Sequence, residues 1–349
     1  MIECRNLGKS YGTVQAVTEI SLSLDEHEFL SILGPSGCGK STLLRLIAGL
    51  EVPSQGQVFL HGQEISGRKI ILPPEHRKFG MIFQDFALFP HLSVKDNVRY
   101  GTTGSKKEKQ QRVHELLELV SLPHLATKMP HQISGGEQQR IAVARALAPR
   151  PRLILMDEPF SNLDYQLRQQ LRRDIREILK HEGVATVLVT HDQVEAITFS
   201  DRMLLMQKGK VVQEGTPAEI YQNPQTIWAS SFVGEANHLP VEWQNDSLNT
   251  PLGDLNVPSE IGKNARIMMV RPEDFKLESA PSDQANGIVK SVDFSGSVQT
   301  VAVALKNAAS VQVSGSPHLL WNQNDSVKIT AERYLCFNSS GNRLKVIPE

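Results

Sequence analysis

The spacing of apolar residues along the chain changes from a mixed strand and helix pattern to a pattern of short strands. Ile20–Leu24 alternates apolar and polar residues as a half-exposed strand does, and Ala185–Val189, which is apolar except for Thr186, is typical of a buried parallel strand. Helices are expected where apolar residues recur every three or four positions, at Thr42–Ala48, Lys106–Val120, Gly135–Leu147 and Asp164–Lys180. Further strands are expected at Glu28–Leu33, Gln57–Leu60 and Lys78–Phe83, and as a hairpin at Met203–Met206 and Lys210–Gln213. Strands that alternate with helices predict an α/β domain.

The second pattern begins after about Gly234. Short alternating runs are separated there by Gly, Pro, Asn and Ser, which favours a small β-barrel or sandwich. The runs are Arg266–Val270, Gly287–Val292, Ser297–Leu305, Ser326–Ala331 and Arg343–Ile347. We therefore expect an α/β domain at residues 1–234 and a small all-β, OB-like domain at residues 235–349.

Composition narrows the classes of protein that fit. The 349 residues are 21% charged and 40% hydrophobic with a net charge of −1, which is typical of a globular protein and gives no electrostatic reason to expect a nucleic-acid partner. The three cysteines are an odd number, and Cys38 lies in a glycine-rich loop, so a reducing compartment is expected. No apolar run reaches the roughly 18 residues that a membrane-spanning helix needs.

A phosphate-binding loop is predicted at Gly34-Pro-Ser-Gly-Cys-Gly-Lys40-Ser41, between an expected strand and an expected helix. Glycines let the backbone N–H groups approach phosphate, and the helix that follows adds a positive N-terminus. Lys40 is expected to bridge the β- and γ-phosphates and Ser41 to bind Mg²⁺. The residues expected to contact ATP here are Gly34, Pro35, Ser36, Gly37, Cys38, Gly39, Lys40, Ser41 and Thr42. The motif indicates nucleotide binding without specifying the reaction.

Two acids follow the apolar run Leu153–Met156, at the end of a predicted strand. Ligands bind at the carboxyl ends of the strands in α/β sheets, so Asp157 and Glu158 are candidates for Mg²⁺ binding and catalysis. A pair of acids at a solvated strand end is the alternative. The phosphate loop upstream favours the catalytic interpretation.

Ser134-Gly-Gly136 opens a predicted helix and is a candidate for a second anion site. It offers a hydroxyl group, exposed N–H groups and a helix dipole. An ordinary N-cap explains the same residues, because serine is a favoured capping residue. The residues alone leave these two interpretations evenly balanced.

In this order, the phosphate loop, Ile133–Arg140 and the acid pair resemble the nucleotide-binding subunits of ABC transporters, a resemblance that covers Met1 to about Gly234. It implies that Glu158 is the catalytic base that polarises the attacking water and that Asp157 holds Mg²⁺ through water. It also implies that Ser134, Gly135, Gly136 and Glu137 bind ATP held by the opposite subunit. The sequence departs from the commonest signature in having Ile133 for leucine and Glu137 for glutamine.

Other positions match the family one by one. Tyr11 resembles the aromatic residue that stacks on adenine, with core packing as its alternative. Gln84 resembles the residue that reaches Mg²⁺ and the attacking water, and the apolar loop Asp85–His91 after it resembles the segment that touches the membrane subunit. His191 resembles the histidine that contacts the γ-phosphate, with a structural role as its alternative. Asp164 belongs to Ser161–Asp164, which resembles the loop that passes between subunits.

The resemblance implies an ATPase that drives solute import, using ATP and Mg²⁺. It would act as a homodimer on the cytoplasmic face of the inner membrane, with separate permease subunits and a periplasmic or surface solute-binding protein. Met269–Asp274 resembles the C-terminal β-domain of importer ATPases, which is often regulatory and dimer-forming. Ferric iron is the favoured solute. Polyamine, thiamine, phosphonate, sulfate and sugar remain open.

Two other classes compete with the importer interpretation. Non-transport ABC ATPases of the chromosome type carry long coiled coils before the signature, and those of the ribosome type usually carry two cassettes. This chain has one plausible charged helix before the signature, and one cassette. A small-molecule kinase or GTPase shares the phosphate loop but gives no reason for Ser134–Gly136.

Overall fold

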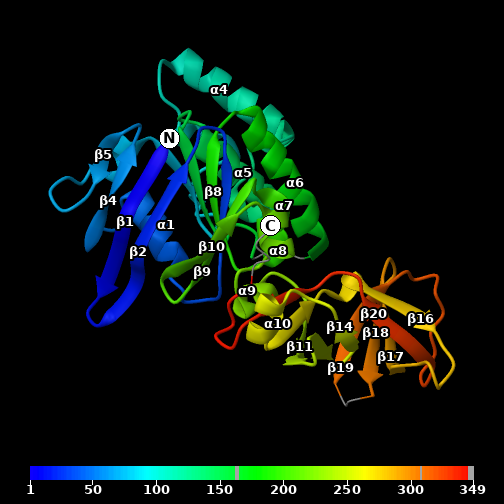
Figure 1. Ribbon diagram of the computed structural model, residues 1–349. Helices are drawn as coiled ribbons and strands as arrows, with labels where there is room; N and C mark the ends of the chain where they lie inside the picture. Colours follow the sequence, from blue (N-terminus) through cyan, green and yellow to red (C-terminus); the bar gives the residue numbers. More distant parts are fainter. Residues whose placement is uncertain (162–164, 307–308, 345–349) are drawn as a thin grey trace. The chain divides into compact units, whose positions relative to one another are not determined.

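The computed structural model describes residues 1–161, 165–306 and 309–344, with the side chains of residues 165 and 166 left out. Internal contacts divide the chain into two compact units, Met1–Ala218 and Glu219–Glu349 (Figure 1). The boundary between the units lies earlier in the sequence than the change of pattern at Gly234. Arg271 helps to explain this, because its buried guanidinium donates to the carbonyls of Tyr221 and Ser230, both at 2.9 Å. Residues 219–234 therefore pack with the second unit.

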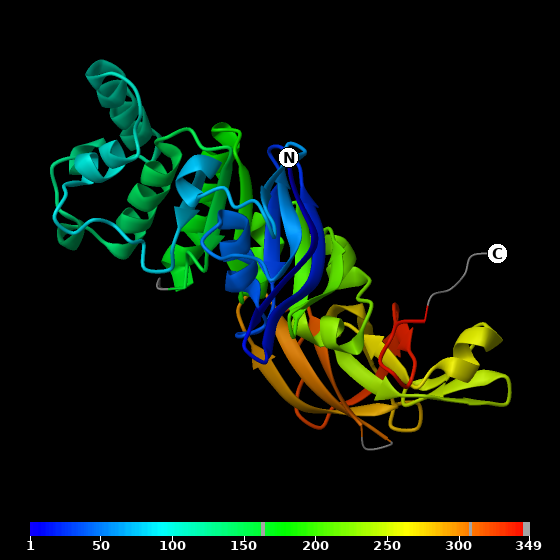
Figure 2. The ribbon, with the colours of Figure 1, turned by 90° about the vertical axis from the view of Figure 1, so that its left-hand side faces the viewer.

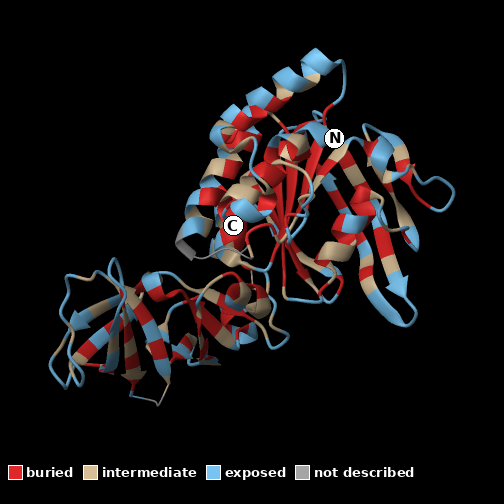
Figure 3. Ribbon diagram, turned by 180° about the vertical axis from the view of Figure 1, so that it is seen from behind, coloured by how far each residue is buried: buried red, intermediate tan, exposed pale blue. Residues whose placement is uncertain are grey.

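A six-stranded sheet forms the centre of the first unit. Its five neighbouring strands β9, β3, β8, β7 and β6 are parallel, and β10 pairs antiparallel at one edge. In sheet order the strands are β10 (Lys210–Gly215), β9 (Arg202–Gln207), β3 (Phe29–Leu33), β8 (Ala185–Thr190), β7 (Leu153–Asp157) and β6 (Phe79–Ile82). Strands β3 and β8 are buried throughout, including the polar residues Ser31, Thr186 and Thr190 within their otherwise apolar sequences (Figure 3).

Both faces of this sheet are covered. Leu30, Leu155 and Val187 point into a core shared with α1 (Lys40–Ala48) and with a second, antiparallel sheet. That sheet has the order β2 (Val14–Leu24), β1 (Ile2–Tyr11), β4 (Gln55–Leu60) and β5 (Gln63–Ser66). Alternate residues such as Phe29 and Leu188 join the opposite core with the remaining helices.

The core on this opposite face of the six-stranded sheet is built mainly by helices. They are α3 (Val94–Tyr100), α4 (Lys106–Leu119), α5 (Gly135–Leu147), α6 (Tyr165–His181) and α7 (Gln193–Phe199), and the short turns are η1 (Pro123–Leu125) and η2 (Pro130–Gln132). Side chains of Ser93, Ser105, Ser134 and Asp192 accept the capping hydrogen bonds at four N-termini, which explains why these helices begin there. Figure 2 shows the helices between residues 94 and 147 gathered on one side of the first unit.

Arg77, at the end of α2 (Pro74–Arg77), ties α1 to the antiparallel sheet. Its side chain is 1% exposed and donates to the carbonyls of Ile47 in α1 and Ile65 in β5, at 2.8 and 3.2 Å. Gly49, the C-cap of α1, has φ of +79°, and a Cβ there would lie 2.3 Å from Arg77 Nε. Glycine is therefore required beside the buried guanidinium.

The second unit is mainly β, which confirms the expected class of the C-terminal region. A five-stranded sheet has the order β16 (Phe275–Ser279), β20 (Ser326–Ala331), β17 (Gly287–Phe294), β18 (Gln299–Leu305) and β19 (Ser310–Gly315). Two three-stranded sheets are β11 (Asn237–Pro240), β15 (Ile267–Val270), β21 (Leu335–Phe337) and β12 (Glu242–Gln244), β13 (Ser247–Thr250), β14 (Gly253–Leu255). Short helices are α8 (Pro217–Gln222, which begins in the first unit), α9 (Ile227–Phe232), α10 (Ser259–Asn264) and η3 (Pro272–Asp274).

The expected strand Arg343–Ile347 lies mostly outside the described residues, so it stays a prediction. Its first residue, Arg343, forms an isolated antiparallel bridge to Phe337 in the edge strand β21. Across the described ranges, no helix is long and apolar enough to span a membrane.

Candidate active site

Several of the predicted site residues lie at or just after the ends of strands that meet at one edge of the six-stranded sheet. Leu33 of β3 lies opposite Thr190 of β8, and Asp157 ends the neighbouring strand β7. β6 runs parallel to β7 and leads to Gln84 at the same edge. Carboxyl ends of parallel strands are where such sheets bind ligands. The topology therefore brings together motifs that are far apart in the sequence.

The path of the phosphate loop is set by close packing at two glycines. A Cβ at Gly34 would lie 2.3 Å from the carbonyl oxygen of Met206 in β9. Gly39 has φ of +102°, and a Cβ there would lie 2.1 Å from the carbonyl oxygen of Ala16 in β2. Side chains at either position would displace the loop from the two sheets. The expected phosphate contacts of this loop remain predictions.

Lys40 is the first residue of α1 and is 4% exposed. Its ammonium donates to the carbonyls of Gly34 and Pro35, at 2.8 and 3.1 Å. Among the residues that the structure describes, Lys40 forms no ion pair, and a buried cation without a counter-charge is unfavourable. A phosphate at this helix N-terminus would supply that charge.

Ser41 and Asp157 form the pair predicted for Mg²⁺. The Ser41 hydroxyl donates to Asp157 Oδ1 at 2.8 Å. Burial raises the pKa of Asp157, and the hydrogen bond from Ser41 opposes that rise. A hydroxyl and a carboxylate are the oxygen ligands that Mg²⁺ uses, and a cation here would offset the burial of the carboxylate. The residues present therefore fit a magnesium ion.

Glu158 and His191 contact each other directly. His191 Nδ1 lies 3.0 Å from Glu158 Oε2, so this nitrogen donates when it carries the proton. The backbone N–H of Glu158 donates to the carbonyl of Val189 at 2.9 Å, and its φ is +46°, a conformation unusual outside glycine. A carboxylate held by a histidine at a strained position fits a general base oriented by a neighbour.

A buried polar network behind His191 was not predicted from the sequence. The Thr190 hydroxyl donates to Glu195 Oε2 at 2.5 Å and accepts from the N–H of Asp192 at 2.9 Å. Glu195 is 3% exposed, and burial raises its pKa. Asp192 also lies 3.5 Å from Arg168 of α6. The spacing of Asp192 and Glu195 is a helix-capping pattern, the one signal that could have marked this network.

The loop after Gln84 is less apolar on its surface than its sequence suggests. Gln84 lies in an exposed turn, but Phe86 is only 8% exposed and Leu88 packs against the helical core. Phe83, which directly precedes Gln84 and lies outside this loop, is 40% exposed. Core packing thus explains much of this apolar segment. Its contact with a membrane subunit remains a prediction, as does the role of Gln84.

Tyr11 ends β1 with its side chain 45% exposed. Lys9 lies over the ring, with its ammonium 4.9 Å from the ring centroid. The core-packing interpretation of Tyr11 is therefore wrong. Stacking on adenine remains a prediction.

Ser134 is the N-cap of α5, which agrees with the interpretation of this serine as an ordinary capping residue. Its hydroxyl accepts from the N–H of Glu137 at 3.4 Å and donates to the Glu137 carboxylate at 2.8 Å. Gly136 packs on α6, since a Cβ there would lie 3.0 Å from Leu167. These contacts explain the turn in one subunit and leave its role in the opposite subunit's site as a prediction. Asp164 lies outside the described residues.

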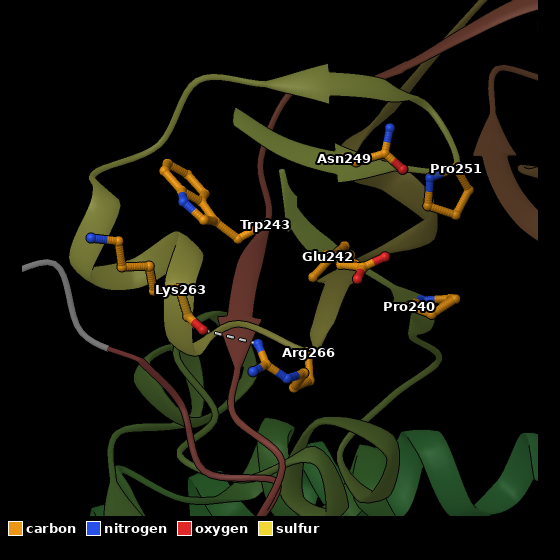
Figure 4. Close-up of a pocket in the computed structure, with 8 residues that line it drawn as sticks. Pro240, Glu242, Trp243, Asn249, Pro251, Lys263 and Arg266 are labelled. Carbon is orange, nitrogen blue, oxygen red and sulfur yellow. Dashed lines mark hydrogen bonds between the residues drawn. The ribbon is translucent and has the colours of Figure 1, made fainter. Parts of the chain in front are cut away.

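A cavity in the second unit involves other residues. It measures about 640 Å³ and is bordered by Trp243, Lys263 and Arg266, as Figure 4 shows. Arg266 donates to the Lys263 carbonyl at 3.0 Å, and both side chains are exposed. No residue predicted to bind ATP lines this cavity.

Comparisons with known proteins identify both regions of the chain. The ABC transporter family model matches residues 17–161, and the TOBE domain model matches residues 268–337. A Fe(3+) ions import ATP-binding protein from Pseudomonas fluorescens is 42% identical over 311 residues, which cover 88% of each chain. Its counterpart from Haemophilus influenzae is 38% identical over 317 residues, covering 88% of this chain and 89% of the relative. A sulfate/thiosulfate import ATP-binding protein from Chromobacterium violaceum is 42% identical over 300 residues, covering 84% and 81%.

Solved structures of ATP-binding cassette proteins are also similar to this chain. A dimeric ATP-binding cassette in a post-hydrolysis state with ADP and phosphate has a TM-score of 0.54 and 32% identity, covering 62% of this chain and 99% of that one. The protein cbiO1 from Clostridium perfringens, part of an ABC transporter complex, has a TM-score of 0.59 and 28% identity, covering 64% and 90%. The predicted fold class, a phosphate-loop ABC ATPase core followed by a β-rich domain, is confirmed. The chain belongs to the ABC transporter family as an ATP-binding, ATP-hydrolysing subunit with a C-terminal TOBE domain.

Proposed function

We propose that the chain is the motor subunit of an import complex that takes up ferric iron through a separate permease. The observation that carries this proposal is the identity of 42% over 88% of both chains with a Fe(3+) import ATP-binding protein. The relative named for sulfate and thiosulfate is equally identical, at 42%, but over a smaller share of each chain. Further relatives named for ferric iron lie at 41% and 40%. Sulfate is therefore the second candidate.

In the proposed mechanism two copies close on two ATP molecules. The phosphate loop of one copy and Ser134–Gly136 of the other bind each triphosphate, and Lys40 and the N-terminus of α1 neutralise phosphate charge. A magnesium ion held by Ser41 and Asp157 would neutralise further charge on the phosphates. Glu158, oriented by His191, accepts a proton from the attacking water. Gln84 positions that water, and Tyr11 stacks on the adenine.

Closure of the dimer would move the permease, and hydrolysis would reset it. The loop Asp85–His91 is proposed to contact the permease, and a solute-binding protein would deliver the ion on the other side of the membrane. Asp164 would lie between the two copies. Residues 1–234 are proposed as the ATPase domain and residues 235–349 as a regulatory and dimer-forming domain.

The ATPase mechanism is tested by Glu158→Gln in the full-length chain. Hydrolysis should fall about 10²–10⁴-fold, the typical contribution of a general base. ATP binding and ATP-dependent dimerisation should remain, as measured by equilibrium binding and light scattering. Glu278→Gln, a change at an exposed carboxylate in the second unit, is the matched control. Near-normal turnover of Glu158→Gln would refute the role of Glu158.

The solute is tested by uptake into cells that lack the gene. Radiolabelled ferric iron and radiolabelled sulfate should be offered in parallel, with the wild-type or the Glu158→Gln gene restored. Wild type alone should restore ferric uptake. Restoration of sulfate uptake instead would favour the second candidate, and restoration of neither would refute both.

A further inference from the structure

Two adjacent residues in the loop after Gln84 have left-handed backbone conformations. The φ angles of Phe86 and Ala87 are +58° and +49°. Residues other than glycine rarely adopt such angles, and two in succession persist only when their surroundings hold them. Strain of this kind often marks a segment whose position matters for function.

Arg145 of α5 holds these two residues. Its Nη1 donates to the carbonyl of Ala87 at 2.6 Å and its Nη2 to the carbonyl of Phe86 at 3.1 Å. The guanidinium also lies 5.4 Å from the ring centroid of Phe89, within the range of a cation–π contact. Burial lowers the pKa of Arg145. In the part of the chain that the structure describes, Arg145 forms no ion pair, so the loop supplies its polar partners.

The other end of the loop is fixed to α3 by Asn97, which is 0% exposed. Its Oδ1 accepts from the N–H of Phe89 at 2.8 Å, and its Nδ2 donates to the Phe89 carbonyl at 3.1 Å. α3 in turn packs closely on α5, because a Cβ at Gly101 would lie 2.9 Å from the carbonyl oxygen of Arg145. The segment Phe86–Phe89 is thus held between two helices.

α5 carries two functional features at its ends. It begins after Ser134, in the turn proposed to bind the opposite subunit's ATP, and Arg145 lies in its last turn. A displacement of α5 would therefore move the two carbonyls that Arg145 holds. Those carbonyls lie directly after Gln84 and Asp85, so the displacement would reach the turn that carries Gln84.

We propose that Arg145 is a positioning residue for ATP hydrolysis. Its guanidinium keeps Phe86 and Ala87 in the left-handed conformation and so couples the position of Gln84 to the helix that begins at Ser134. This inference rests on the proposed roles of Gln84 and Ser134. Glu158→Gln tests the ATPase mechanism separately, so a failure there is distinguishable from a failure here.

The main test is Arg145→Lys in the full-length chain. Lysine keeps the charge but lacks the planar fork that spans two carbonyls. The kcat for ATP hydrolysis should fall about tenfold, equivalent to about 1.4 kcal/mol, while KM stays within about twofold. Amide hydrogen exchange at residues 85–89 should accelerate, while exchange within α4 stays as in the wild type.

Arg112→Lys is the matched control. Arg112 also donates to a backbone carbonyl, that of Leu147 at 3.2 Å, and it pairs with Glu182. Within the described part of the chain it forms no hydrogen bond or ion pair with residues 85–89, so Arg112→Lys should leave exchange there unchanged. Unchanged kcat and unchanged loop exchange in Arg145→Lys would overturn the proposal. Equal acceleration of loop exchange by both variants would also overturn it, because it would indicate general loosening.

A second variant tests the role of strain. Glycine adopts positive φ without steric penalty, so Ala87→Gly should restore part of the lost kcat when combined with Arg145→Lys. A merely structural role of Arg145 predicts no such rescue. If the double variant hydrolyses ATP more slowly than Arg145→Lys alone, the coupling through backbone strain is refuted.

Discussion

Arg77→Met is the change whose effect on stability follows most directly from the structure. Methionine has a similar length but no hydrogen-bond donors. Arg77 donates to the carbonyls of Leu72 and Ile47, both at 2.8 Å, and to that of Ile65 at 3.2 Å. The Ile65 carbonyl also accepts from the N–H of Leu72 at 2.8 Å, so it keeps a donor in the variant. The change therefore leaves the carbonyls of Ile47 and Leu72 without the guanidinium's hydrogen bonds, and that of Ile47 is buried.

The magnitude depends on two opposing terms. Each buried acceptor left unsatisfied costs about 1–3 kcal/mol. Removing a buried guanidinium recovers part of this, because burial is unfavourable enough to lower the pKa of Arg77 to about 10. Two carbonyls that lose their donor, less this relief, give an expected loss of about 2–4 kcal/mol. For a unit of this size, that loss lowers Tm by roughly 4–16 °C.

The two units allow an internal control. The three tryptophans, Trp228, Trp243 and Trp321, all lie in the second unit, so their fluorescence reports its unfolding. Far-UV circular dichroism detects the helices of the first unit. Arg77→Met should lower the midpoint temperature of the dichroism transition and leave that of the fluorescence transition unchanged. The dichroism midpoint of Arg77→Lys, which keeps the charge but has fewer donors, should lie between those of Arg77→Met and the wild type.

A loss below about 1 kcal/mol in Arg77→Met would refute the reasoning. It would mean that relief of charge burial outweighs the lost hydrogen bonds, as in some buried ion pairs that apolar residues replace without loss. Equal shifts of the dichroism and fluorescence transitions would refute the assumption that the units unfold separately.

Three further predictions concern pH and metal. Burial lowers the pKa of His238 below 6.5, so the unfolded chain binds a proton at a higher pH than the folded chain does. The second unit should therefore lose stability as pH falls below about 6.5. Urea titrations followed by tryptophan fluorescence should show a smaller loss of stability with falling pH in His238→Gln. Burial raises the pKa of Glu195 above 4.5, so the folded chain holds this proton at a higher pH than the unfolded chain does. The wild type should therefore lose stability relative to Glu195→Gln as pH rises from about 4.5 through the raised pKa, and the difference in unfolding free energy should be constant above that pKa. A difference in unfolding free energy that is the same at every pH would contradict this prediction. Ser41→Ala should raise the Mg²⁺ concentration for half-maximal hydrolysis at least about tenfold, whereas Ser41→Thr, which keeps the hydroxyl, should not.

Helices and strands in which apolar residues follow one regular spacing were predictable from the sequence. β8 includes the mostly apolar run Ala185–Val189 that was expected to form a buried strand, and α5 lies at the residues expected for it, between Ser134 and Pro149. β1 escaped prediction because its pairing with β2 shifts register several times, which breaks the alternation of apolar and polar residues. Local sequence therefore predicts regular elements better than irregular ones.

The places of the phosphate loop and the acid pair at the ends of strands were also predictable, because both are local patterns that follow apolar runs; the roles of their residues stay predictions. Arg77, Asn97 and Arg145 were not predictable. Each acts mainly through backbone carbonyls of other segments, for example the Ile47 carbonyl for Arg77 and the Ala87 carbonyl for Arg145. A carbonyl is present at every residue, so the sequence carries no mark of such a partner. Only the tertiary path of the chain creates these contacts.

The close approach of Gly49 to Arg77 limits the order in which this protein can evolve. A side chain at position 49 collides with the guanidinium, whereas shortening of Arg77 removes the obstacle. The φ of +79° at Gly49 strains any other L residue there even after Arg77 has been shortened, so a change at 77 lowers the cost of a change at 49 without removing it. The route through 77 is therefore the less costly one, and screens of single variants would not show how much of the cost at 49 depends on Arg77.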